Sequence, residues 1–234
     1  MAGIRVLTQT LDEGGARFET LIVEPDASRA VAVFAAGRGG KPARHKGFLQ
    51  ALGERGLAVI APEFDMLEPA APRAEALESR ARRLALALES FAPSGAPIAG
   101  IGHSIGATMV LGLAGGEIRT RDRERVVLES PRTIHRLALF APAVDFFQAP
   151  GALDRVRASM RIWVGSEDTI TPPARMEIIR AGLGEDVEVD VRLVPDAGYF
   201  TFMNELPPNV VDPHPDREGF LAGLAEEVSG LLLG

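Results

Sequence analysis

The sequence predicts an α/β fold with a mostly parallel central sheet and helices on both faces of that sheet. From residue 30 onward, short runs rich in Val, Ile, Leu and Phe alternate with amphipathic stretches. This alternation is typical of consecutive strand and helix units, in which apolar strands are buried between two helical layers. A chain of 234 residues is long enough to bury such a sheet. Residues 1–234 are therefore expected to form a single domain without a separate lid.

The expected elements are short and are separated by Gly, Pro and polar residues. Strands are expected at residues 18–23, 30–36, 58–61, 97–102, 137–141, 161–165 and 187–194. Helices are expected at residues 42–55, 74–91, 105–114, 172–181 and 216–233, the last of them capped by Asp216. Residues 125–129 are interpreted as part of a small surface hairpin, and the basic segment 119–125 as a solvated connection.

Charge and composition exclude several classes of partner. The net charge of −7 disfavours nucleic acid and anionic membrane, because phosphate binding depends on clustered Lys and Arg. The chain has no cysteine and four scattered histidines, so neither disulfides nor a metal site is expected. There is no signal-like N-terminus and no apolar run of about 20 residues. A cytoplasmic protein without a cofactor is the resulting expectation, and the oligomeric state is left open.

One pentapeptide carries the clearest chemical signal in the chain. Residues 102–106 read Gly-His-Ser-Ile-Gly and lie between an apolar strand and an apolar helix. A sharp turn from strand to helix holds such a serine in strained backbone, and a side chain on either flank would collide. The turn lifts the hydroxyl clear of the sheet and toward the first amides of the helix. Ser104 is therefore the predicted nucleophile of a hydrolase.

A serine nucleophile also needs a general base, a carboxylate that orients this base, and donors for the oxyanion. Asp168 follows an expected strand, at the end of the sheet where functional groups gather, and is the candidate carboxylate. The alternative interpretation is that Asp168 closes a turn or caps a helix. The amide of Ile105 is one expected oxyanion donor. The second is expected from Arg38, or otherwise Gly39, in the glycine-rich loop after an inner strand.

The order of these motifs resembles that of the lidless branch of the α/β-hydrolase superfamily, close to bacterial dienelactone-hydrolase-like proteins. The likeness covers nearly the whole chain and is carried by residues 102–107, 139–142, 165–172 and 195–198. It implies a serine hydrolase of the esterase type, with Ser104 and Asp168 as the first two members of a catalytic triad.

The chain departs from the resemblance at the third member of the triad. Relatives place a histidine directly after the Ala-Gly pair that follows the last strand, whereas this chain has Tyr199. A phenol titrates at about 10, so it is a poor proton acceptor at neutral pH. His214, in the loop before the last helix, is the first candidate for a relocated base. His103 is expected to point away from the serine, His45 to lie at the pocket rim, and His135 to have no role.

Apolar side chains at the ends of the expected strands are predicted to wall a pocket for a small ester. Phe146, Phe147 and Phe200 are the ones expected nearest to a ligand. Two hypotheses then remain open. The first is an esterase or dienelactone-type hydrolase with an atypical or degenerate triad. The second is a catalytically impaired ligand-binding or regulatory protein, in which Tyr199 bridges Asp168 and the ligand.

Overall fold

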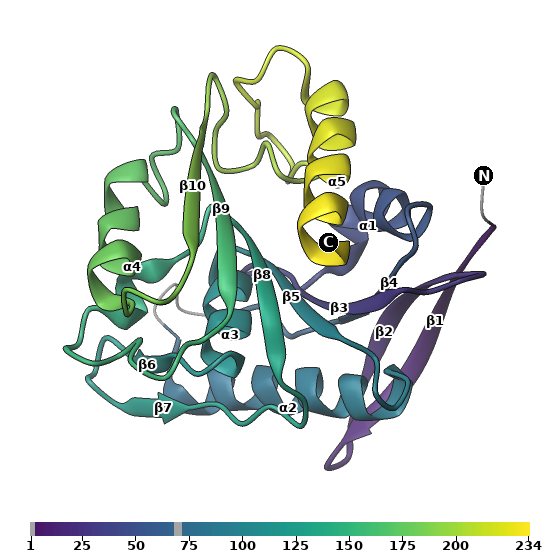
Figure 1. Cartoon of the computed structure of the whole chain (residues 1–234), viewed down its shortest axis with the longest axis horizontal. Helices are drawn as coiled ribbons and strands as arrows, with labels where there is room; N and C mark the ends of the chain where they lie inside the picture. Colours follow the sequence, from purple (N-terminus) through teal and green to yellow (C-terminus); the bar gives the residue numbers. More distant parts are fainter. Residues whose placement is uncertain (1–2, 68–71) are drawn as a thin grey trace.

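A mixed eight-stranded sheet forms the centre of this computed structural model, which describes residues 3–67 and 72–234 (Figure 1). From β4 to β10 in the sheet order, neighbouring strands pair in parallel. β1 and β2 add an antiparallel edge. The order of the strands across the sheet is β1 (Ile4–Glu13), β2 (Ala16–Pro25), β4 (Leu57–Pro62), β3 (Ala30–Ala35), β5 (Ile98–His103), β8 (Ile134–Phe140), β9 (Ser159–Gly165) and β10 (Val189–Val194).

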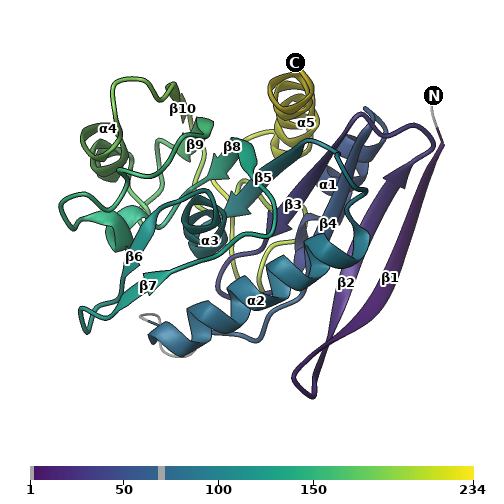
Figure 2. The same ribbon diagram turned by 60° about the horizontal axis from the view of Figure 1, so that its bottom comes forward.

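Helices cover both faces of the sheet, as the alternation of strands and helices predicted (Figure 2). One face packs against α2 (Ala74–Phe91), α3 (Ile105–Leu113) and α4 (Glu177–Gly182). The other face packs against α1 (Lys46–Gly53) and α5 (Arg217–Leu233), which also contact each other. The described residues also form three single turns of 3-10 helix, η1 (Pro42–His45), η2 (Val144–Phe147) and η3 (Pro173–Met176).

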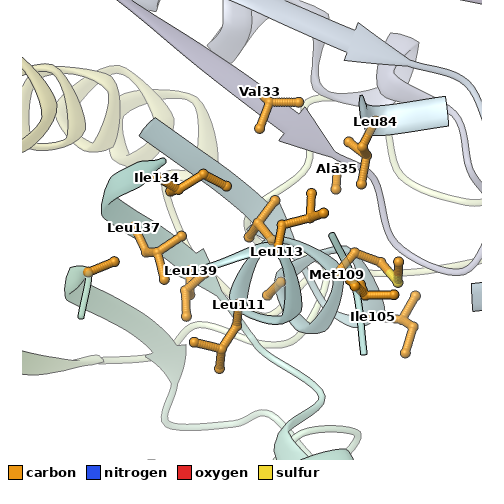
Figure 3. Close-up of a cluster of buried hydrophobic side chains, with 14 of the residues drawn as sticks. Val33, Ala35, Leu84, Ile105, Met109, Leu111, Leu113, Ile134, Leu137 and Leu139 are labelled. Atoms are coloured by element: carbon orange, nitrogen blue, oxygen red, sulfur yellow. The ribbon is translucent and has the colours of Figure 1, made fainter. Parts of the chain in front are cut away.

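The inner strands are apolar throughout because both of their faces are buried. In β3, Val31, Val33 and Ala35 face the α2 and α3 side, while the alternate residues face α1 and α5. All nine residues of α3 are buried, which explains why this helix is apolar on every side. Figure 3 shows side chains from α3, β3, β8 and α2 meeting in one cluster. This packing fixes the end of β5 and the start of α3, between which the candidate nucleophile lies.

All of the expected strands and helices are present, and their ends agree with the expected ones to within three residues. The expected helices at 42–55 and 172–181 each begin with a 3-10 turn, and the cap of α5 is confirmed by Asp216, which accepts the amide of Gly219 at 2.9 Å. The surface hairpin consists of β6 (Glu117–Arg119) and β7 (Arg125–Val127), so part of the presumed connection is a strand. The strand β1, which pairs with β2 over ten residues, was not among the expected elements.

Candidate active site

Ser104 occupies a sharp bend between β5 and α3. Its backbone has φ 58° and ψ −125°, a conformation that L-residues adopt only under constraint. A Cβ atom at Gly102 would lie 2.5 Å from the amide nitrogen of Ala107, and one at Gly106 would strike the carbonyl oxygen of Ala35. The prediction that both flanking residues must be glycine is therefore confirmed.

Ser104 lies at the wall of a cavity of about 640 Å³, a volume typical of small-molecule sites. The serine is 7% exposed, and its amide donates to the carbonyl of Phe140 at 2.9 Å. Its own carbonyl accepts the amide of Ala107 at 2.9 Å. Because these backbone bonds hold the bend from both sides, the serine is presented to the cavity by a fixed piece of main chain.

The glycine-rich loop forms a tight turn beside the serine. The amide of Gly40 donates to the carbonyl of Gly37 at 3.0 Å, which puts Arg38 and Gly39 at the centre of the turn. A Cβ atom at Gly37 would come within 3.4 Å of the Ser104 Cβ. Arg38, Gly39 and Ile105 all line the cavity with the serine. Ile105 is the first residue of α3, so its amide has no partner within the helix.

Asp168 is buried in the loop that follows β9. Its Oδ1 accepts the amides of Ile170 and Thr171, both at 2.8 Å, and its Oδ2 accepts the Thr171 hydroxyl at 2.6 Å. The aspartate therefore forms the local turn that was its alternative role. Its charge also acts on Tyr199, so the carboxylate lies close enough to influence the phenol. Oδ2 carries one of these bonds and retains capacity for a second donor.

Tyr199 interacts with both Ser104 and Asp168. Burial raises the pKa of the Tyr199 phenol above its ordinary value of 10.0, and the negative charge of Asp168 acts in the same direction. A hydrogen bond with the Ser104 side chain and the charge of Arg38 oppose the increase. The phenol is consequently a neutral group at physiological pH, and it does not have the basicity needed to take the serine proton.

Two buried histidines pack behind Tyr199. The ring of His103 lies 4.8 Å from the Tyr199 ring and 5.3 Å from the His45 ring. His103 Nε2 is 3.1 Å from the carbonyl oxygen of Tyr199, and His45 Nδ1 is 3.1 Å from that of Phe202. A carbonyl accepts only a proton on nitrogen, so these two bonds assign the N–H of each ring. Both histidines hold the segment that carries Tyr199, and both line the cavity.

Acid is expected to destabilise the protein through these two histidines. Burial lowers the pKa of His103 to about 4 and that of His45 well below 6.5. Between pH 6.5 and about 4 the unfolded chain therefore binds protons that the folded chain does not bind. His103 alone makes the free energy of unfolding fall by about 1.4 kcal/mol per pH unit in this window, and His45 adds to the loss.

Urea unfolding at pH 7 and pH 5 measures this effect. His103→Gln should reduce the pH dependence, whereas His135→Gln is the matched control because His135 is exposed on the surface. Equal pH dependence in the native protein and in His103→Gln would contradict the assignment.

The remaining predicted site residues are divided between the cavity and the core. Phe146 and Phe200 line the cavity, together with Met203. Phe147 is buried in the core on the α3 side and is absent from the cavity wall, because it points away from its neighbour within the short turn η2. His214 does not line the cavity either.

The side chain of His214 is occupied elsewhere in the last loop. Its Nδ1 accepts the amide of Asp216 at 3.2 Å, and its ring packs 5.1 Å from the Phe220 ring at the start of α5. The structure thus brings Ser104, Tyr199 and the oxyanion candidates to one cavity, places the Asp168 charge within reach of Tyr199, and leaves His214 away from the cavity.

Neither a cluster of metal-binding side chains nor a membrane-spanning helix is found among the residues that the structure describes. Residues 3–67 and 72–234 contain no group of three or more His, Cys, Asp or Glu side chains that is arranged to hold a metal ion. Among the described helices, none is both long enough and apolar enough to cross a bilayer.

Fold and site together define the class: the chain has the α/β-hydrolase fold, with a serine at the bend where that fold carries its nucleophile. It is similar to a predicted CIB-like hydrolase from Thermoplasma acidophilum, with 16% identity, a TM-score of 0.68, and coverage of 98% of this chain and 100% of that one. It is also similar to a dienelactone hydrolase from Anabaena variabilis, with 19% identity, a TM-score of 0.65, and coverage of 97% and 96%.

A third similar structure is a thermophilic esterase from Thermogutta terrifontis with propionate bound, at 14% identity, a TM-score of 0.65, and coverage of 95% and 93%. No protein-family model matches the sequence, and no curated protein matches it significantly. At these identities the likeness establishes the fold, and the chemistry has to be argued from the residues of this chain.

Proposed function

We propose that this protein is a carboxylic-ester hydrolase of low turnover, in which Ser104 is the nucleophile. The observation that carries the proposal is the strained bend that holds Ser104 beside the cavity and next to the glycine turn. The esterase and dienelactone hydrolase among the similar structures support this reaction class. Backbone strain of this kind costs free energy, and residues that carry it cluster at active sites and ligand-binding sites.

In the proposed reaction, Ser104 Oγ attacks the carbonyl carbon of a small ester. The amides of Ile105 and of Arg38, or of Gly39, donate to the oxygen that becomes negatively charged, and the alkoxide then leaves and takes up a proton from solvent. Water then cleaves the acyl-enzyme. The serine proton passes to solvent, because the neutral phenol of Tyr199 is a poor acceptor. Esters whose leaving group departs as a stable anion, such as p-nitrophenyl esters, should therefore react faster than alkyl esters.

Ser104→Ala is expected to abolish formation of the acylated protein, because the Ser104 oxygen carries the acyl group. The residual rate of an enzyme without its base is about 10³ to 10⁴ over water, and it depends on the oxyanion donors and on positioning. Hydrolysis of p-nitrophenyl acetate, together with the mass of the acylated protein, measures both steps. Ser166→Ala is the control, since that serine is exposed and does not line the cavity. Acylation that persists in Ser104→Ala would contradict the proposal.

A relocated base at His214 is tested in the same assay. Because His214 lies away from the cavity, His214→Ala is expected to leave the rate within about twofold of the native value. A loss comparable to that of Ser104→Ala would instead show that the last loop folds back over the site.

The second candidate function is that of a ligand-binding protein without turnover. It is favoured by the Tyr199 phenol, which fills the space beside Ser104 and stays protonated, so that it is available as a donor to a ligand. A native protein as inert as Ser104→Ala, and a small carboxylic ester that raises the melting temperature of both, would favour this function.

A further inference from the structure

Arg80 is a buried cation in the middle of α2, the helix that lies against β4 and α3 (Figure 2). Its guanidinium group makes no contact with a buried carboxylate and instead donates to main-chain carbonyls. Nη2 donates to Arg38 and to Asp65, both at 2.8 Å, and Nη1 donates to Gly37 at 3.0 Å and to Ala36 at 3.4 Å. One side chain thus binds four carbonyl groups. Three belong to the consecutive residues 36–38 at the glycine turn, and the fourth belongs to residue 65 in the neighbouring segment.

These carbonyls belong to two segments that leave adjacent strands. Ala36–Arg38 follows β3 and leads into the turn beside Ser104, and Asp65 lies in the segment after β4. The same two segments are joined by the amide of Phe64 to Gly40 at 2.9 Å and by the amide of Leu67 to Arg38 at 3.1 Å. Arg80 lies at their junction, where the Phe64 ring packs 4.8 Å from its guanidinium carbon.

Planarity of the peptide group makes these bonds directional. In a trans peptide the carbonyl of one residue and the amide of the next point in opposite directions. When Arg80 holds the carbonyl of Gly37, it also sets the direction of the Arg38 amide. When it holds the carbonyl of Arg38, it sets the direction of the Gly39 amide. Both amides then point away from α2, and no residue of α2 is among the described residues that line the cavity.

Stability is a poor explanation for a guanidinium group at this place. Burial lowers the pKa of Arg80 to about 10, with a contribution from the charge of Arg83, so the side chain remains a desolvated cation at neutral pH. Its Nε is also buried without a hydrogen-bond partner. No buried carboxylate offsets this cost, so the compensation comes from the hydrogen bonds that Arg80 donates to main-chain carbonyls around the glycine turn.

We infer that Arg80 is a positioning residue that aims the backbone amides of Arg38 and Gly39 at the oxyanion formed on Ser104. This inference rests on the proposed function. Arg80 itself does not reach the reacting atoms; it acts by fixing two peptide planes. Its expected effect is confined to the charged tetrahedral species and does not extend to the binding of the neutral ester.

The test uses p-nitrophenyl ethyl methylphosphonate, which reacts with a nucleophilic serine. The Ser104 oxygen forms a bond to phosphorus, p-nitrophenolate leaves, and the serine proton passes to solvent. Arg80→Lys keeps the charge but cannot bind several carbonyls in a fixed plane. We expect it to lower the phosphonylation rate about tenfold or more, and kcat for p-nitrophenyl butyrate by a similar factor, while KM stays within about twofold.

Arg83→Lys is the matched control. Arg83 lies on the same helix and is also buried, but its Nε and Nη2 bind the carboxylates of Glu13 and Asp65, and its Nη1 contacts the Glu63 carbonyl. It should leave the phosphonylation rate unchanged. If Arg80→Lys does not fold, Arg80→Gln, a neutral donor, replaces it in the comparison, and circular dichroism confirms the folded state of each variant.

The outcomes distinguish the proposed esterase function from the positioning role of Arg80. A native protein that the phosphonate does not label would overturn the proposed function, and the role of Arg80 with it. A native protein that is labelled at the same rate as a folded Arg80 variant would overturn the positioning role alone. A parallel loss in the Arg83 variant, or a rise in KM equal to the loss in kcat, would show that α2 acts only as structural support.

Discussion

Replacing Tyr199 with histidine is expected to raise the rate of p-nitrophenyl acetate hydrolysis about tenfold or more. The phenol lies next to the Ser104 side chain and under the influence of Asp168, so an imidazole at this place would stand between the nucleophile and the carboxylate. Asp168 Oδ2 accepts one hydrogen bond, from Thr171, and has capacity for the N–H of an imidazole. Neutral imidazole accepts a proton near pH 7, which the phenol cannot do.

Three further variants test the cause of the rate increase expected for Tyr199→His. Tyr199→Phe removes the hydroxyl without adding a base, so its rate should stay near that of the native protein. Adding Ser104→Ala to Tyr199→His should abolish the gain, and adding Asp168→Asn should remove most of it. The gained rate should also increase with pH as the imidazole loses its proton. A folded Tyr199→His protein with the native rate would show that the cavity no longer fits the transition state.

Local patterns were sufficient to predict most of the fold. The buried strands β3, β5 and β8 are continuous apolar runs between turn residues, and the amphipathic helix α2 has the bounds that its periodicity indicated. β1 was missed because all ten of its residues are at least partly exposed and its apolar residues do not alternate cleanly. Gly14 and Gly15, both at positive φ, form the turn that joins it to β2, and a Gly-Gly pair is the signal that indicates such a hairpin.

The candidate site was predictable where its geometry depends on neighbours in sequence. The bend at Ser104, the glycine turn after β3 and the aspartate after β9 are short motifs with steric causes. The contacts around Tyr199 depend on packing between distant segments. His45 and His103 meet the segment 199–202 across more than 95 residues of sequence, and Arg80 meets the glycine turn across more than 40. No spacing rule in the sequence indicates such contacts.

The glycine turn and the start of α3 form a single unit, because they approach each other without intervening side chains. Gly106 lies against the carbonyl groups of Ala35 and Ala36, which lead directly into Gly37 and Arg38. This close approach brings the amide of Ile105 to the same side of the cavity as the glycine turn. The absence of a side chain at residue 106 therefore matters for the two proposed oxyanion donors as well as for packing.

Gly106→Ala is accordingly expected to lower the free energy of unfolding by about 3 kcal/mol or more. The added Cβ would strike the Ala35 carbonyl oxygen and lie 2.7 Å from that of Ala36, and rigid main chain on both sides prevents relief of the clash. Gly223→Ala makes the same chemical change on the exposed side of α5, where nothing lies within 4 Å. This control should gain about 0.5 to 1 kcal/mol, since alanine favours helix.

Urea unfolding followed by circular dichroism measures both variants. If the added methyl group lowers the free energy of unfolding in Gly106→Ala and raises it in Gly223→Ala, the bend is held against β3. Equal stability of the two would mean that α3 does not approach β3 this closely. The constraint that holds Ser104 at positive φ would then be lost, and with it the structural argument for a nucleophile at this residue.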